Sequence, residues 1–224
     1  MRTLHPDVLN ATLPGLADAA SHVRSSVVQV CPLASPNRAT NATGSGVVWR
    51  RFPDGAALVV SNAHVASTLQ LRVIGPGGSQ STAMLIARDP IRDLALMSVA
   101  PELYDAVPAR RARRLPLRAG EFVVAVGHPF GVKNAVSSGV VHAVGPVATE
   151  ARIPPPQGDL EWVQADVRLG PGSSGGPLVD ADGNILGINT MIVGGLALAV
   201  PLAAILAFVE TAVTRGAVAR AASL

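Results

Sequence analysis

The segment Gly172-Ser173-Ser174-Gly175-Gly176 has the composition of a loop that presents a nucleophile. Glycines on both sides of a serine allow a tight turn that exposes the hydroxyl group and leaves room for a substrate carbonyl beside the backbone. In such a turn the N–H groups of Gly172 and Ser174 can converge on a developing oxyanion, each donor being worth about 3–4 kcal/mol. We therefore predict acyl transfer at Ser174 with an oxyanion hole formed by Gly172 and Ser174, Ser173 being a third candidate donor. A glycine- and serine-rich turn without chemistry would have the same composition.

The same five residues also match G-x-S-x-G, the nucleophile elbow of α/β-hydrolases. In those enzymes the catalytic acid and then the histidine follow the serine in the chain. Here the last histidine is His142, so no histidine follows Ser174. The predicted strands also do not alternate with helices, so the elbow interpretation fails on both counts.

His64 is the best candidate for the base that a serine hydroxyl needs to become nucleophilic. It lies in Ser61-Asn62-Ala63-His64-Val65, directly after the apolar run 57–60, which places it at the end of a strand. Side chains of a scaffolded site commonly occupy such positions. The remaining histidines are interpreted as exposed or structural: His5, His22, His128 and His142.

Two aspartates could hold the far nitrogen of that histidine in one tautomer. Asp93 opens the apolar run 94–99 and can therefore be buried. Asp89 precedes a proline, which favours a solvated turn. The sequence thus favours Asp93 as the residue that orients His64.

The pattern along the chain predicts that short β-strands position these residues. An amphipathic helix is expected at residues 16–26, and turn signals separate the apolar runs that follow it. Twelve runs are expected to be strands: 27–30, 46–49, 57–60, 69–74, 83–87, 94–99, 122–126, 138–144, 160–165, 177–179, 185–188 and 196–200. Two sets of six predict an all-β fold of two six-stranded antiparallel β-barrels with short N-terminal and C-terminal helices. We expect a single domain, 1–224, with barrel 1 at about 24–104, barrel 2 at about 115–203 and the C-terminal helix at about 201–215.

Composition narrows the class of protein further. Hydrophobic residues make up 49% and aromatic residues 3%, so the core must consist of Val, Leu, Ile and Ala. Net charge is +3, and the arginine cluster 110, 111, 113 and 114 is interpreted as a solvated loop between the barrels, not as a nucleic-acid site. The one cysteine, Cys31, allows no intramolecular disulfide, and no metal-ligand spacing or cofactor motif occurs.

The run 191–209 has 19 residues without a charge, the length of a membrane-spanning helix. Glycines at 194 and 195 and Pro201 interrupt it, so we expect a strand followed by a helix and no membrane span. The first thirty residues contain no apolar segment typical of a secretory signal peptide, which favours the cytoplasm.

Several short motifs occur together in one order and carry a family resemblance: 62–65 (NAHV), 93–96 (DLAL), 126–131 (VGHPFG), 138–141 (SGVV), 164–166 (QAD), 174–178 (SGGPL) and 187–190 (GINT). Over about residues 14 to 210 the chain resembles the protease domain of HtrA/Deg-type serine proteases, within the chymotrypsin-like superfamily. The resemblance implies a catalytic triad of His64 and Asp93 from barrel 1 and Ser174 from barrel 2. It implies that Asn189, Thr190 and Met191 pair with an extended peptide substrate.

The resemblance also implies that Leu169, Met191 and Ile192 border the S1 pocket. Such an apolar border favours aliphatic P1 residues, whereas Arg168, if it faced the pocket, would favour acidic ones. The implied function is a serine endopeptidase that cleaves unfolded or damaged proteins through an acyl-enzyme intermediate. The alternative is a resting or inactive protease-fold module that binds peptides.

The chain departs from the family pattern in several ways. Ser173 stands where the family usually has asparagine and trypsin relatives have aspartate, so no charge-driven zymogen switch is expected. Family members commonly carry a C-terminal PDZ domain, and we expect none here. Members mostly act outside the cytoplasm and trimerise through N-terminal aromatic residues, whereas no aromatic residue precedes Trp49. Compartment and oligomeric state therefore stay open.

Overall fold

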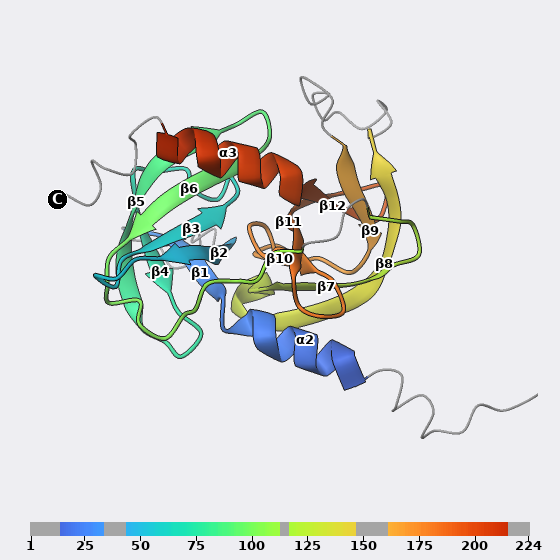
Figure 1. Ribbon diagram of the computed structural model, residues 1–224, viewed down its shortest axis with the longest axis horizontal. Coiled ribbons are helices and arrows are strands. Elements are labelled where there is room, and N and C mark those ends of the chain that lie inside the picture. The colour runs from blue at the N-terminus through green and yellow to red at the C-terminus, as the bar shows by residue number, and fades with distance from the viewer. Residues whose placement is uncertain (1–13, 34–43, 113–116, 147–160, 215–224) are drawn as a thin grey trace, which may run out of the picture.

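The computed structural model describes residues 14–33, 44–112, 117–146 and 161–214, and these form two closed six-stranded antiparallel barrels (Figure 1). The first barrel has the order β1-β2-β3-β6-β5-β4, with β1 Val27–Pro32, β2 Gly44–Arg51, β3 Ala57–Ser61, β4 Gln70–Ile74, β5 Gln80–Asp89 and β6 Leu94–Val99. The second has the order β10-β11-β12-β9-β8-β7, with β7 Phe122–Gly127, β8 Ala135–Gly145, β9 Trp162–Asp166, β10 Pro177–Val179, β11 Ile185–Val193 and β12 Leu196–Pro201. The predicted all-β fold of two barrels with short terminal helices is confirmed.

Side chains on the two faces of one strand can belong to two different apolar clusters. In β3, Leu58 and Val60 face the neighbouring barrel, whereas Val59 faces the interior of its own barrel. Successive side chains of a strand point to opposite faces, so a strand that is apolar throughout is buried on both sides. β3 is such a strand, since all five of its residues are buried.

Three apolar clusters result from this arrangement. One fills the first barrel, with Val, Ala, Leu and Met as its buried members, and another fills the second, with Val, Ala and Leu. The third lies between the barrels and contains both tryptophans, Trp49 at 4% exposure and Trp162 at 2%. The aromatic-poor core expected from composition thus describes the barrel interiors, and the interface carries the large rings.

Two α-helices within the described ranges fasten the barrels to each other. Helix α2 (Pro14–Arg24) precedes the first barrel in sequence but packs against β7 of the second. Helix α3 (Leu202–Thr214) follows β12 and extends across β5 and β6 of the first barrel, as the red helix in Figure 1 shows. The uncharged run 191–209 is therefore the end of β11, β12 and the start of α3. None of the helices described here is long and apolar enough to cross a membrane.

The segment that connects the barrels also contacts both of them. Arg111 forms a parallel bridge with Ile185 of β11, and its guanidinium lies 5.1 Å from the ring centroid of Trp49 in β2. Arg110 and Arg111 are exposed, whereas positions 113 and 114 of the arginine cluster lie outside the described residues.

We expect Ile205→Ala in α3 to lower the free energy of unfolding by about 2–5 kcal/mol, because this fully buried side chain belongs to the cluster between the barrels. Urea unfolding followed by circular dichroism measures the loss. Leu206→Ala is the matched control, since Leu206 is the next residue of the same helix and is 41% exposed. Equal losses in the two variants would show that α3 does not anchor the barrels as described.

Candidate active site

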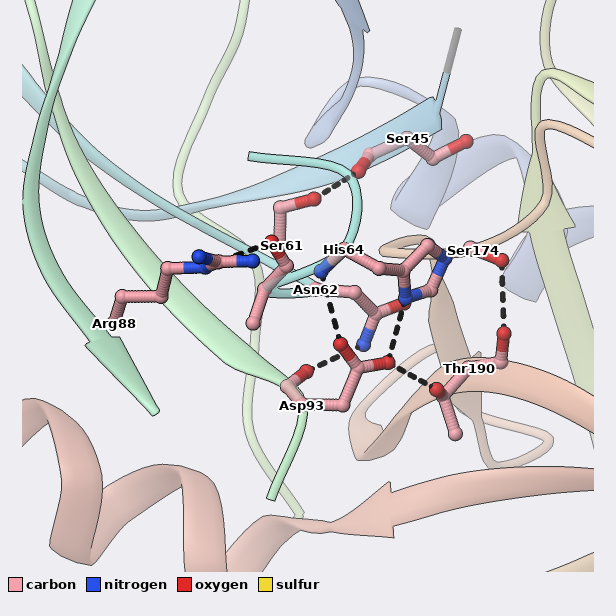
Figure 2. Close-up of polar contacts among 9 residues, drawn as sticks. Ser45, Ser61, Asn62, His64, Arg88, Asp93, Ser174 and Thr190 are labelled. Carbon is pink, nitrogen blue, oxygen red and sulfur yellow. Dashed lines mark hydrogen bonds and ion pairs between the residues drawn. The ribbon is translucent and has the colours of Figure 1, made fainter. Parts of the chain in front are cut away.

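His64 and Asp93 meet because their strands are neighbours. His64 follows β3 and Asp93 precedes β6, and these strands pair antiparallel with Ser61 opposite Ala95. The Nδ1 atom of His64 lies 2.8 Å from Oδ2 of Asp93, and the backbone N–H of His64 donates to Oδ1 at 3.0 Å (Figure 2). The carboxylate is 14% exposed and the imidazole 53% exposed. Asp93 therefore holds one ring nitrogen while the rest of the ring remains open to solvent.

Two further residues position the Asp93 carboxylate. Asp93 has φ 54, in the left-handed region that few residues other than glycine adopt. The buried Asn62 side chain donates through Nδ2 to the Asp93 carbonyl at 2.8 Å, which helps to hold that conformation. The Thr190 hydroxyl of the second barrel donates to Asp93 Oδ2 (Figure 2). Sequence reasoning missed Asn62 and assigned Thr190 to substrate alone, because neither contact is visible from sequence spacing.

Hydrogen bonds fix several carbonyl groups of the nucleophile loop, residues 170–176. The Pro171 carbonyl accepts from the N–H of Phe130 at 2.7 Å. The Gly172 carbonyl accepts from Ser45 Oγ at 2.8 Å, and the Ser174 carbonyl accepts from the N–H of Ser45 at 2.7 Å. Each bond fixes the plane of one peptide group, and the N–H of a trans peptide points away from its carbonyl. The loop is therefore held in one conformation on both sides of Ser174.

Two backbone N–H groups beside the nucleophile have no hydrogen-bond acceptor among the described residues. The N–H of Ser173 donates to Gly170 at 2.9 Å, so this third candidate for the oxyanion hole is already bonded within the loop. The N–H groups of Gly172 and Ser174 donate no hydrogen bond to any of the described residues. Gly172 has φ 102, a conformation that glycine adopts without strain. Gly172 and Ser174 are partly exposed and flank Ser173, and two fixed donors this close in the chain suit the binding of an oxyanion.

The Ser174 hydroxyl donates to the Thr190 carbonyl at 2.8 Å, and it forms no hydrogen bond with His64 in this conformation. Figure 2 shows the His64 ring between the Asp93 carboxylate and Ser174, with the hydroxyl directed away from the ring toward Thr190. A rotation of the Ser174 side chain between staggered positions is needed to direct the hydroxyl at the imidazole.

Within the described ranges, no group of three or more His, Cys, Asp or Glu side chains is placed to hold a metal ion.

The residues expected to bind substrate separate into three environments. Asn189 is fully buried, and its side-chain Nδ2 donates to the carbonyls of Gly176 and Pro177, so it supports the nucleophile loop and does not face a cleft. Met191 is partly buried, and Ile192 is 52% exposed on β11.

Leu169 lies elsewhere. It borders a cavity of about 360 Å³ with Arg168, Phe130 and Val136, and that cavity includes neither Met191 nor Ile192. Leu169 also packs against the interior of the second barrel. An S1 pocket bordered by Leu169, Met191 and Ile192 stays a prediction.

His128 is buried at 2% exposure beside the nucleophile loop. Burial, with a smaller contribution from the positive charge of Lys133, lowers the pKa of His128 from 6.5 to about 4. The side chain is therefore neutral at neutral pH.

This shift predicts a pH-dependent stability. The unfolded chain binds a proton at about pH 6.5 and the folded chain at about pH 4, so the contribution is fully present above pH 6.5 and declines as the pH falls to 4. The decline amounts to about 3 kcal/mol. Urea unfolding between these pH values should show a smaller decline in His128→Asn, whereas His22→Asn, at an exposed histidine, should keep it. An unchanged slope in His128→Asn would contradict the assignment.

Comparisons with known proteins agree with this geometry. The family described as a trypsin-like peptidase domain matches residues 44–188. The mitochondrial serine protease HTRA2 of Bos taurus is 38% identical over 163 residues, which are 71% of this chain and 34% of that protein. The serine protease Do-like HtrA of Bacillus subtilis is 28% identical over 225 residues, which are 95% of this chain and 48% of that protein.

Solved structures show the same fold. The HtrA-type protease AlgW with a tripeptide has a TM-score of 0.75 at 28% identity, covering 91% of this chain and 65% of that one. The serine endoprotease from Yersinia pestis has a TM-score of 0.73 at 25% identity, covering 90% of this chain and 67% of that one. The chain spans 34% and 48% of the two curated relatives named above. With the family match extending over more than half of its length, the chain belongs to the trypsin-like peptidase family and has HtrA serine proteases as relatives.

Proposed function

We propose that this chain is a serine endopeptidase that cleaves extended polypeptide segments through an acyl-enzyme intermediate. The observation that carries the proposal is the pair of unpaired N–H groups at Gly172 and Ser174, in the loop whose Ser174 lies beside the His64–Asp93 pair of the other barrel (Figure 2). Donors fixed before the reaction stabilise an oxyanion without reorganisation, which is usually the largest single contribution to acyl transfer.

The first half of the reaction uses each group in turn. The Ser174 hydroxyl rotates from the Thr190 carbonyl toward His64, which takes its proton as the oxygen attacks the peptide carbonyl carbon. Asp93 accepts a hydrogen bond from the Nδ1–H group of His64 throughout, stays ionised and stabilises the imidazolium. The carbonyl oxygen of the substrate becomes an oxyanion bound by the N–H groups of Gly172 and Ser174. His64 then protonates the leaving amine.

The second half repeats these roles with water. His64 takes a proton from a water molecule, which attacks the ester carbon of the acylated Ser174, and the same two N–H groups bind the second oxyanion. Collapse of this intermediate releases the carboxylic acid and returns the proton to Ser174.

The free edge of β11 supports an extended substrate. β10 pairs only with residues 185–188 of β11, whereas β12 pairs with residues as far as Val193 on the other edge. Residues Met191–Val193 therefore have no strand partner on one edge among the described residues. A peptide can add to such an edge only as an extended strand, which favours unfolded segments over folded domains. The apolar side chains of Met191 and Ile192 favour an aliphatic P1 residue.

Labelling with a serine-reactive fluorophosphonate, read by mass spectrometry at about pH 8, tests the proposal. We expect the label on Ser174 in the wild-type protein and no label on that peptide in Ser174→Ala. An unlabelled, folded wild-type sample would overturn the peptidase function and leave a peptide-binding module as the better description.

A further inference from the structure

Ser45 lies in the first barrel but bonds to the nucleophile loop of the second. Its N–H donates to the Ser174 carbonyl at 2.7 Å, and its hydroxyl donates to the Gly172 carbonyl at 2.8 Å. The residue is fully buried. The loop passes so close that a Cβ atom at Gly175 would lie 2.0 Å from the Ser45 carbonyl oxygen. One serine therefore fixes the peptide groups on both sides of the nucleophile.

The same serine is also bonded to the strand that carries the base. The Ser61 hydroxyl donates to the Ser45 carbonyl at 2.6 Å, and Ser61 is the last residue of β3, three positions before His64 (Figure 2). Base and nucleophile come from different barrels, so their separation depends on how the barrels are aligned. The hydrogen bonds of Ser45 add a directional link between the barrels, beside the apolar cluster that lies there.

His128 completes the link from the side of the second barrel. Its backbone N–H donates to Ser45 Oγ at 3.0 Å, and its Nδ1 atom lies 3.3 Å from the same oxygen. The single hydroxyl proton of Ser45 is already donated to the Gly172 carbonyl. Ser45 Oγ can therefore only accept from the ring, so Nδ1 of the neutral imidazole must carry the proton.

We propose that Ser45 and His128 are positioning residues that align Ser174 and the Gly172 peptide group with His64 across the two barrels. The inference rests on the proposed peptidase function. Neither residue reaches the substrate in this arrangement, so their loss should slow the chemical step and leave substrate affinity nearly unchanged. A misplacement of about 1 Å in such a site can cost about 10²-fold in rate.

The test compares Ser45→Ala with Ser81→Ala in the otherwise unchanged chain. Ser81 is also a buried serine of the first barrel, and its hydroxyl donates to the Ala100 carbonyl at 3.1 Å, away from the nucleophile loop. We expect similar losses of stability in both variants. Only Ser45→Ala should show kcat and the rate of fluorophosphonate labelling lowered by about 10²-fold, with KM changed by less than about threefold. Equal labelling rates in the two variants would overturn the proposal.

Two replacements of His128 separate its positioning role from its packing. The Nδ2 atom of asparagine can occupy the place of Nδ1, whereas glutamine places its amide near the position of Nε2. We expect His128→Asn to keep the labelling rate within about threefold and His128→Gln to lower it by about tenfold or more. Equal rates in the two variants would remove His128 from the proposal.

Amide hydrogen exchange of the peptide covering residues 170–176 gives a readout that does not require activity. We expect exchange in this segment to be faster in Ser45→Ala than in Ser81→Ala. A wild-type protein that is not labelled would overturn the peptidase function alone, and the exchange result would still decide whether Ser45 holds the loop. Unchanged exchange in Ser45→Ala would overturn the positioning role.

Discussion

Replacing Ser174 with alanine is expected to lower kcat for peptide hydrolysis by about 10⁶-fold, while the protein stays folded and binds peptide as before. The variant retains the two free N–H groups and the His64–Asp93 pair, but it has no oxygen to attack the carbonyl carbon. Hydrolysis of a fluorogenic peptide measures the loss, and Ser81→Ala, at a buried serine away from the loop, should retain wild-type activity.

Adding His64→Ala to Ser174→Ala should cost almost nothing more, because nucleophile and base act as one unit. Two independent, multiplying losses would mean that His64 does not serve Ser174. Substantial activity in Ser174→Ala would place the nucleophile at another residue.

Asp93→Asn is expected to lower kcat by about 10⁴-fold with little change in fold. The asparagine side chain can present an N–H group to Nδ1 of His64, which favours the tautomer in which the other ring nitrogen carries the proton and cannot take one from Ser174. The Thr190 hydroxyl would also lose its charged acceptor. The measurement is kcat as a function of pH for the variant and the wild type.

Asp89→Asn is the matched control for this prediction. Asp89 is the other aspartate of the segment, and its carboxylate forms an exposed pair with Arg92 at 2.8 Å. We expect its replacement to change kcat by less than about threefold, since exposed ion pairs contribute little. A larger loss in Asp89→Asn than in Asp93→Asn would reverse the assignment of the two aspartates.

The barrels were predictable because their signals are local. Each strand is an apolar run between turn residues, as in β3 and β6, and the ends of such runs predicted where His64 and Asp93 lie. The contacts of Ser45 were not predictable, because Ser45 and Gly172 are 127 positions apart and meet only when the barrels have closed and packed. A serine between two glycines resembles a turn in sequence, whereas here it is a buried strand residue.

The expected roles along β11 differed from the structure for a related reason. The register of β11 with β12 shifts between Asn189 and Met191, so a bulge changes which side chains face inward. A bulge re-aims the side chains beside it, and nothing in the local sequence shows where it falls. Asn189 consequently points into the protein, and Thr190 reaches Asp93 of the other barrel.

The positions of the two tryptophans allow intrinsic fluorescence to report on the interface between the barrels. Both indole rings lie in the cluster between the barrels, and neither barrel interior contains an aromatic residue among its described members. Emission from Trp49 and Trp162 therefore responds to water entering between the barrels, whereas loosening inside either barrel leaves it nearly unchanged. If the barrels separate before they unfold, fluorescence will change at a lower denaturant concentration than the circular dichroism of the strands.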